Sequence, residues 1–178
     1  MTISLTKFLR RFRGSESGTA SLEFVLVAPF FLGLMMFSIE MGFLTMRATV
    51  LERGLDIAVR EVRLGTGTAP QHDDIKRIIC DNTVIVSDCE NNLRLEMSPA
   101  DIRNFSALDE TADCTDQAEP AKPVRQFVPG QQNELMLLRA CLRYNPLFPQ
   151  QILGSRLVND SNGQASLIAT TAFVQEPI

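Results

Sequence analysis

The 178-residue chain has no tryptophan, one tyrosine and one histidine, so several side chains that commonly serve catalysis are scarce or missing. It also contains no GxSxG nucleophile elbow, no HExxH zinc motif and no glycine-rich phosphate loop. We expect His72 to be an exposed polar residue at a helix start rather than a catalyst. Asp73 and Asp74 are expected to serve the dipole of that helix rather than a cation. The sequence therefore predicts a protein that is not an enzyme, with no cofactor and no metal.

The net charge changes sign along the chain. Residues 1–18 carry a net charge of +3, which leaves −7 for the rest of the total of −4. This acidic balance, without a basic patch that contains aromatic residues, argues against nucleic acid as a partner. A basic flank before an apolar run keeps the N-terminus in the cytoplasm and suits contact with anionic membrane lipid. We therefore expect the later residues to lie outside the cytoplasm.

Charge is absent from Phe24 to Ile39. If Glu40 is tolerated, the apolar run reaches about Met46 and forms roughly 35 Å of helix, enough to span a bilayer with some tilt. A cleaved secretory signal is less favoured because the run is long, contains Pro29 and lacks an A-x-A-like cleavage site. Pro29 is expected to bend the helix. Glu23, at the start of the run, would be costly inside a membrane unless it has a partner or a role.

Beyond the membrane the helix is predicted to continue. Small and apolar residues recur at helical spacing, at Leu44, Ala48, Leu51, Leu55, Ala58 and Val62. The pattern predicts one helix from about Thr19 to Leu64, ended by Gly65 and Gly67. The stripe is too short for a coiled coil, so we favour packing of its outer half on its own domain over packing between molecules.

Residues 66–178 are predicted to form a small extracytoplasmic α+β domain. We expect a helix in 72–82, short strands at 83–89 and 93–98, and a long polar connection over 109–133. Two apolar segments, 134–149 and 164–175, flank the turn sequence "NDSNG". Both are interpreted as strands, although the composition of the first also permits a helix. The fold class is therefore a long N-terminal transmembrane helix that extends into a domain with a short antiparallel sheet.

Four cysteines follow the apolar run, at Cys80, Cys89, Cys114 and Cys141. An even number on the side predicted to be oxidising indicates two disulfides. Free thiols or a zinc site are the alternatives, but zinc is disfavoured because the chain has no CxxC pair and one histidine. Of the three possible pairings, proximity in the sequence favours Cys80 with Cys89 and Cys114 with Cys141.

The sequence "SGTASLEF" after a short basic leader resembles the processing site of type IV prepilins. The resemblance implies that a prepilin peptidase cuts after Gly18, so that Thr19 becomes the N-terminus, ahead of Glu23 and Phe24. Glycine leaves room for a protease to approach the backbone. The new amine could pair with Glu23 of the same chain or of an adjacent subunit. The alternative is that Glu23 lies, solvated, at headgroup depth.

The wider segment "GTASLEFVLVAPFFLGLMM", with Pro29 six residues after Glu23, resembles the start of the TadE/TadF-like pseudopilins of the tight-adherence (Flp) pilus. "LRYNPLFP" and "SLIATTAFV" are similar to the C-terminal half of that family. The resemblance is strong over 14–40, modest over 134–176 and absent between them. Glu40 departs from the pattern because it interrupts the apolar segment. The two branches, TadE and TadF, are not separated by these motifs.

Membership of that family implies a minor pseudopilin of a Flp (type IVc) pilus that helps to initiate, assemble or anchor the fibre. The implied partners are the prepilin peptidase, other pilins and pseudopilins, and the inner-membrane tight-adherence secretion machinery. The chain would divide into a cytoplasmic leader (1–18), a membrane-spanning and extended helix (19–65) and a periplasmic domain (66–178). The protein would be anchored in the bacterial inner membrane or associated with the pilus. The alternative is an uncleaved single-pass anchor that carries a binding or adhesion domain.

Overall fold

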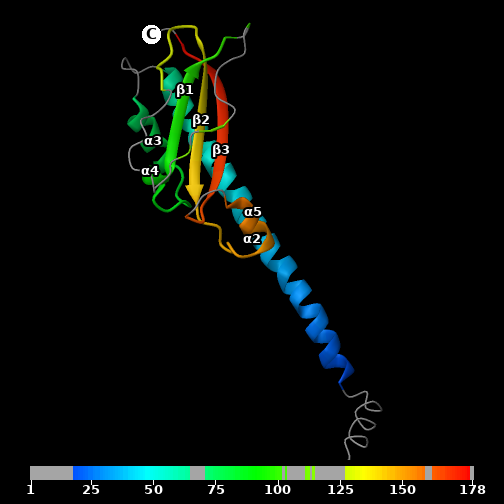
Figure 1. Ribbon diagram of the computed structural model, residues 1–178. Helices are drawn as coiled ribbons and strands as arrows, with labels where there is room; N and C mark the ends of the chain where they lie inside the picture. Colours follow the sequence, from blue (N-terminus) through cyan, green and yellow to red (C-terminus); the bar gives the residue numbers. More distant parts are fainter. Residues whose placement is uncertain are drawn as a thin grey trace, which may run out of the picture. The chain divides into compact units, whose positions relative to one another are not determined.

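The computed structural model describes residues 18–64, 71–101, 103, 111–112, 114, 127–158 and 162–176 (Figure 1). The leader before Gly18, the predicted stop at Gly65 and Gly67, and most of the connection 109–133 lie outside the described residues. The chain divides into two compact units, Met1–Ile39 and Glu40–Ile178. Its elements are α2 (Thr19–Leu64), α3 (His72–Asp81), α4 (Cys89–Asn92), β1 (Leu93–Pro99), β2 (Leu135–Tyr144), α5 (Ile152–Leu157) and β3 (Ala165–Val174).

The predicted helix from Thr19 to Leu64 is confirmed as α2, which is continuous through Pro29. In the second unit its apolar stripe is buried, with side chains at most 3% exposed at Leu51, Leu55, Ala58 and Val62. These residues belong to one core cluster with the inward residues of β1 and β2. The outer half of the stripe therefore packs on its own domain, as the sequence favours.

The sheet is antiparallel in the order β1-β2-β3. Leu95 of β1 pairs with Ala140 of β2, which pairs in turn with Ala169 of β3, and all three are buried. The C-terminal half of α2 lies against one face of this sheet, as Figure 1 shows. The strand interpretation of segment 134–149 is thus confirmed for Leu135–Tyr144, whereas residues 145–149 leave the strand, and the α+β class is confirmed as well.

The other face of the sheet is covered over β1 and β2, whereas alternate residues of β3, such as Ile168, are exposed. Glu96 and Arg139 are opposite one another on β1 and β2 and form an ion pair of 2.7 Å, with side chains only 6% and 9% exposed. Arg139 also donates a hydrogen bond to the Thr111 carbonyl, and Cys114 is bonded to Cys141 of β2. Parts of the connection between β1 and β2 therefore lie on this face, so β1 is buried on both sides.

The predicted strand at 83–89 is wrong. These residues form turns that lead into α4, and Val84 is 87% exposed. The disulfide between Cys80 and Cys89 gives the physical reason, because it holds their Cα atoms 5.6 Å apart. A seven-residue strand would separate its ends by about 20 Å. Asp88 completes the reversal with a φ of 57°, in the left-handed region.

Two further features differ from the sequence expectation. The short helix α5 was not predicted; it lies between β2 and β3, in the segment interpreted as a loop.

His72 is more buried than the sequence predicts: its side chain is only 18% exposed, and its ring meets the Phe127 ring edge-on, with centroids 5.3 Å apart. The hydrogen bond from His72 to Asp73 and the nearby imidazole charge lower the pKa of Asp73. The contact with Phe127, 55 residues further along the chain, thus covers a histidine that was expected to be exposed.

Candidate membrane and assembly site

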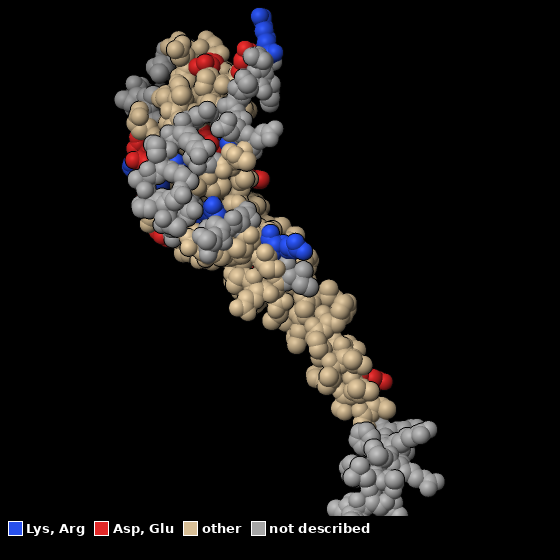
Figure 2. Space-filling view, viewed as in Figure 1, with Lys and Arg blue, Asp and Glu red and all other residues tan. Residues whose placement is uncertain are grey.

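The first unit presents an apolar surface. From Gly18 to Ile39 the only charged residue is Glu23, and large side chains such as Phe24 and Phe30 are each 71% exposed. Figure 2 shows this part of α2 as almost uniformly uncharged. The helix is long and apolar enough to cross a membrane. Such exposure is costly in water and favourable in lipid, so the segment has the properties of a membrane anchor.

The predicted cleavage position coincides with the start of this helix. The Gly18 carbonyl accepts hydrogen bonds from the Leu22 amide at 3.1 Å and from the Ser21 hydroxyl at 2.9 Å, and α2 begins at Thr19. Among the described residues, apart from its chain neighbours and its own helix backbone, no atom lies within 4 Å of the position that a Cβ on Gly18 would occupy. The fold itself therefore places no steric demand for glycine at this residue.

Glu23 lies four residues beyond Thr19, so both occupy one face of α2. It is exposed and forms no ion pair with any residue that the structure describes. A shallow hollow of about 460 Å³ adjoins it on the same helix. Its lining combines small and large side chains: Ala20, Glu23, Phe24, Val27, Ala28, Phe31 and Leu32. The carboxylate thus lies beside a recess in an otherwise apolar surface.

Glu40 is the residue that the sequence interpretation left unexplained. Its side chain is buried in the second unit, with the residue 2% exposed. One carboxylate oxygen accepts from the Leu147 amide at 3.3 Å and the other from the Phe148 amide at 2.9 Å. Glu40 is therefore not a charge in lipid. It joins α2 to the turn that follows β2, and it is the first residue of the folded second unit.

The two disulfides join Cys80 to Cys89 and Cys114 to Cys141, which is the pairing that sequence proximity favoured. The first connects the end of α3 to the start of α4. The second holds residue 114 against β2. All four cysteines are therefore disulfide-bonded in the structure.

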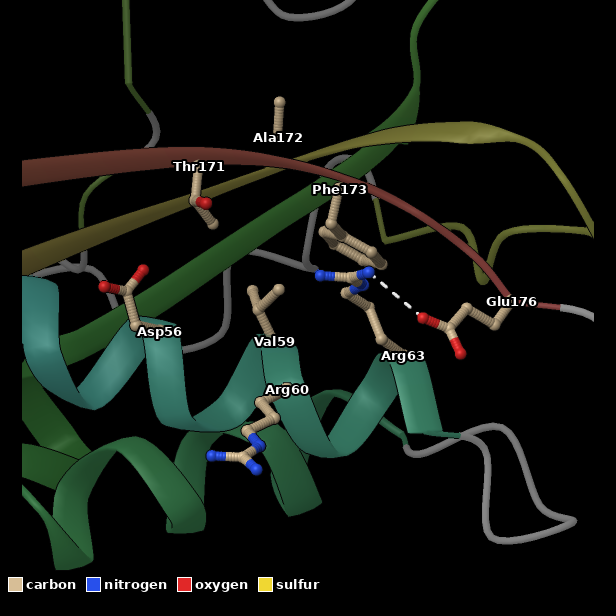
Figure 3. Close-up of a pocket in the computed structure, with 8 residues that line it drawn as sticks. All are labelled: Asp56, Val59, Arg60, Arg63, Thr171, Ala172, Phe173 and Glu176. Atoms are coloured by element: carbon tan, nitrogen blue, oxygen red, sulfur yellow. Dashed lines mark hydrogen bonds and ion pairs between the residues drawn. The ribbon is translucent and has the colours of Figure 1, made fainter.

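A hollow of about 430 Å³ lies between α2 and β3 (Figure 3). Val59 and Phe173 point into it, and the ion pair of 3.0 Å between Arg63 and Glu176 crosses one end. Both partners of this pair are about half exposed, so it contributes little to stability. The other lining residues are Asp56, Arg60, Thr171 and Ala172.

These features define a class of protein: a single apolar helix that continues into a small α+β domain with two disulfides. Residues 18–60 match the protein family described as TadE-like protein. No curated protein and no solved structure matches the chain. The resemblance to the TadE-like family is thereby confirmed, over most of α2. The match supports a role in the tight-adherence pilus system.

Proposed function

We propose that this protein is a minor pseudopilin of a tight-adherence pilus that is cut after Gly18 by a prepilin peptidase. The observation that carries the proposal is the TadE-like match, which begins at Gly18 itself, directly before the first residue of α2. The N-terminus faces the cytoplasm, residues 19–65 contain the helix that crosses the inner membrane, and the domain in 66–178 is periplasmic. The protein acts by packing against partners, not by catalysis.

The proposed cut changes the start of α2. It removes the Gly18 carbonyl, and with it the acceptor of the Leu22 amide and of the Ser21 hydroxyl. The new amine of Thr19 adds a positive charge to the N-terminal end of the helix, which is already the positive end of its dipole. A carboxylate in the neighbourhood is therefore stabilised more strongly after the cut than before it.

Glu23 supplies that carboxylate. Within one chain it lies on the same face as Thr19, one helical turn away. When subunits pack side by side, the amine of one helix can instead meet Glu23 of its neighbour. Either charge is expensive in an apolar environment when it is alone and much less so when it is paired, so the pair sets the axial register of the helices. The hollow beside Glu23 gives an adjacent helix room to approach.

The partners that follow from this function are the prepilin peptidase, other pilins and pseudopilins, the inner-membrane tight-adherence machinery and membrane lipid. The peptidase needs Gly18 at the start of the helix, while assembly needs Glu23. The two requirements are separable because the residues act at successive steps.

The test compares Gly18→Ala and Glu23→Gln in cells with a working prepilin peptidase and a pilus that can be quantified. Gly18→Ala should retain the leader. Because no other part of the described fold crowds that position, a steric clash within it does not explain the retention. Glu23→Gln should be processed but should lower pilus assembly severely. Glu52→Gln, an exposed change on the outer part of the same helix, is the matched control. Normal assembly of Glu23→Gln would refute the pairing role, and normal processing of Gly18→Ala would refute the cut.

A further inference from the structure

The uncharged run of α2 is shorter than the hydrocarbon core of a bilayer. Residues 24–39 would span about 24 Å as a helix, whereas the core is about 30 Å thick. With Glu23 at the headgroups on one side, the missing length of roughly one helical turn has to come after Ile39. The part of α2 that crosses the membrane therefore extends past Glu40.

The surface of α2 beyond Glu40 suits lipid. No charged residue follows until Arg47, about 10 Å further along the helix. The Thr45 hydroxyl donates a hydrogen bond to the Met41 carbonyl at 3.0 Å, so it needs no water. Large apolar side chains here are between 37% and 50% exposed, at Met41, Phe43 and Met46. This part of the helix therefore continues the apolar surface of the run before it.

Glu40 itself presents no charge to its surroundings, because its side chain is buried. Its carboxylate oxygens accept hydrogen bonds from the amides of Leu147 and Phe148, at 3.3 Å and 2.9 Å. The turn after β2 thus lies against α2 at the level of Glu40, and Figure 1 shows this turn and α5 beside the helix. The turn therefore shares the depth that Glu40 has in the membrane.

The turn carries no charge of its own. The chain has no charged residue from Tyr144 to Ser155, a stretch that is flanked by Arg143 and Arg156. Within it, Leu147 is 44% exposed. A single exposed leucine is common on protein surfaces. This one, however, belongs to an uncharged turn that is hydrogen-bonded to α2 directly after the uncharged run, where lipid can cover it.

We propose that residues 145–149 lie in the membrane interface, with the Leu147 side chain inserted among the lipid chains. The partner of this surface is the bilayer itself. The boundary of the hydrocarbon core then falls between Phe43 and Arg47, and the turn shields the Glu40 carboxylate from lipid. The second unit thereby has a fixed depth at the membrane. The proposal rests on the membrane-spanning role of α2, but not on the cut after Gly18 or on pilus assembly.

The chain has no tryptophan, so a single introduced tryptophan reports on one position. Leu147→Trp is made in the full-length chain and placed in liposomes of phosphatidylcholine that is brominated on its acyl chains near the headgroup. Bromine quenches tryptophan on contact, so a loss of fluorescence identifies a side chain among the lipid chains. Leu34→Trp, at a 51% exposed position of the uncharged run, is the lipid control. Val174→Trp is the water control, because Val174 is 46% exposed and pairs with Leu135, at the opposite end of β2 from the turn.

We expect Leu147→Trp to be quenched roughly half as strongly as Leu34→Trp, because the interface borders the region of the lipid chains. Val174→Trp should keep its fluorescence. If Leu147→Trp is as bright as Val174→Trp while Leu34→Trp is quenched, the inference is overturned and the membrane anchor stands. If Leu34→Trp is not quenched either, the anchor is overturned, and the inference with it.

Phe43→Trp is a second and more conservative variant, since it replaces one exposed aromatic side chain with another. The same lipid should quench it, because Phe43 lies before the proposed boundary. Circular dichroism and intact disulfides check that Leu147→Trp is folded. If it is not, Phe43→Trp decides, and unquenched fluorescence of that variant would overturn the inference.

Discussion

Removing the Glu40 carboxylate should loosen the attachment of α2 to the turn after β2. Glu40→Ala deletes both acceptors of the Leu147 and Phe148 amides. Hydrogen bonds to charged groups contribute roughly 1.5 to 3 kcal/mol each. The bond to Leu147, at 3.3 Å, is the longer one and its residue is 44% exposed, so its amide can regain water. We therefore expect a loss of about 2 to 4 kcal/mol in the free energy of unfolding of the second unit.

The assay is denaturant unfolding of the full-length chain in non-ionic detergent with its disulfides intact, followed by the fluorescence of Tyr144. Hydrogen exchange measured by mass spectrometry adds a local readout, because the amides of Leu147 and Phe148 should lose protection. Glu40→Gln keeps one acceptor oxygen and should lose about half as much stability. Glu52→Ala, at an exposed position of the same helix, should change stability by less than about 0.5 kcal/mol. Equal stabilities of Glu40→Ala and Glu52→Ala, with unchanged amide protection, would refute the reasoning.

Three further predictions concern the second unit. Gly54→Ala should destabilise it, because a Cβ there would lie 2.9 Å from the Thr83 hydroxyl and 3.1 Å from the Ile79 carbonyl. At Gly42 no described atom outside the helix backbone and the chain neighbours lies within 4 Å of a Cβ, so Gly42→Ala should be neutral or stabilise by up to about 1 kcal/mol in thermal unfolding. Reductant should lower the melting temperature markedly, because each disulfide contributes roughly 2 to 4 kcal/mol; an unchanged melting temperature after complete reduction would contradict this. Burial raises the pKa of Tyr144 above its ordinary value of 10.0, so the unfolded chain ionises first and stability should fall as pH rises beyond about 10. Tyr144→Phe should remove that part of the fall, and identical pH profiles of the two proteins would contradict the burial effect.

The long helix and the three strands could be predicted from the sequence because their signals are local. The stripe through Leu51, Leu55 and Ala58 repeats at the helical period, and the alternation in 164–175 has the period of a strand. Periodicity also identified the face of α2 that packs on the domain. The TadE-like segment was recognisable for the same reason, since its motif lies within one continuous run of residues.

The errors arise where distant contacts override local signals. The apolar run at 83–89 reads as a strand, but the disulfide between Cys80 and Cys89 closes it into turns. Glu40 looks like an interruption of the membrane helix because its hydrogen-bond partners lie 107 and 108 residues away. The cation–π contact of Arg47 with Tyr144 was missed too, since the two residues come from α2 and β2 and share no motif. Sequence reasoning thus recognised the TadE-like segment but missed the contacts that Glu40 makes at the start of the second unit.

The account depends most on the state of the N-terminus. Intact mass and N-terminal peptide analysis of the protein, purified from the membranes of cells with an active prepilin peptidase, measure that state directly. We predict a mature chain that begins at Thr19 and lacks the residues up to and including Gly18. A chain that retains Met1 and the basic leader in such cells would contradict the proposed processing, and with it the pairing of the Thr19 amine with Glu23.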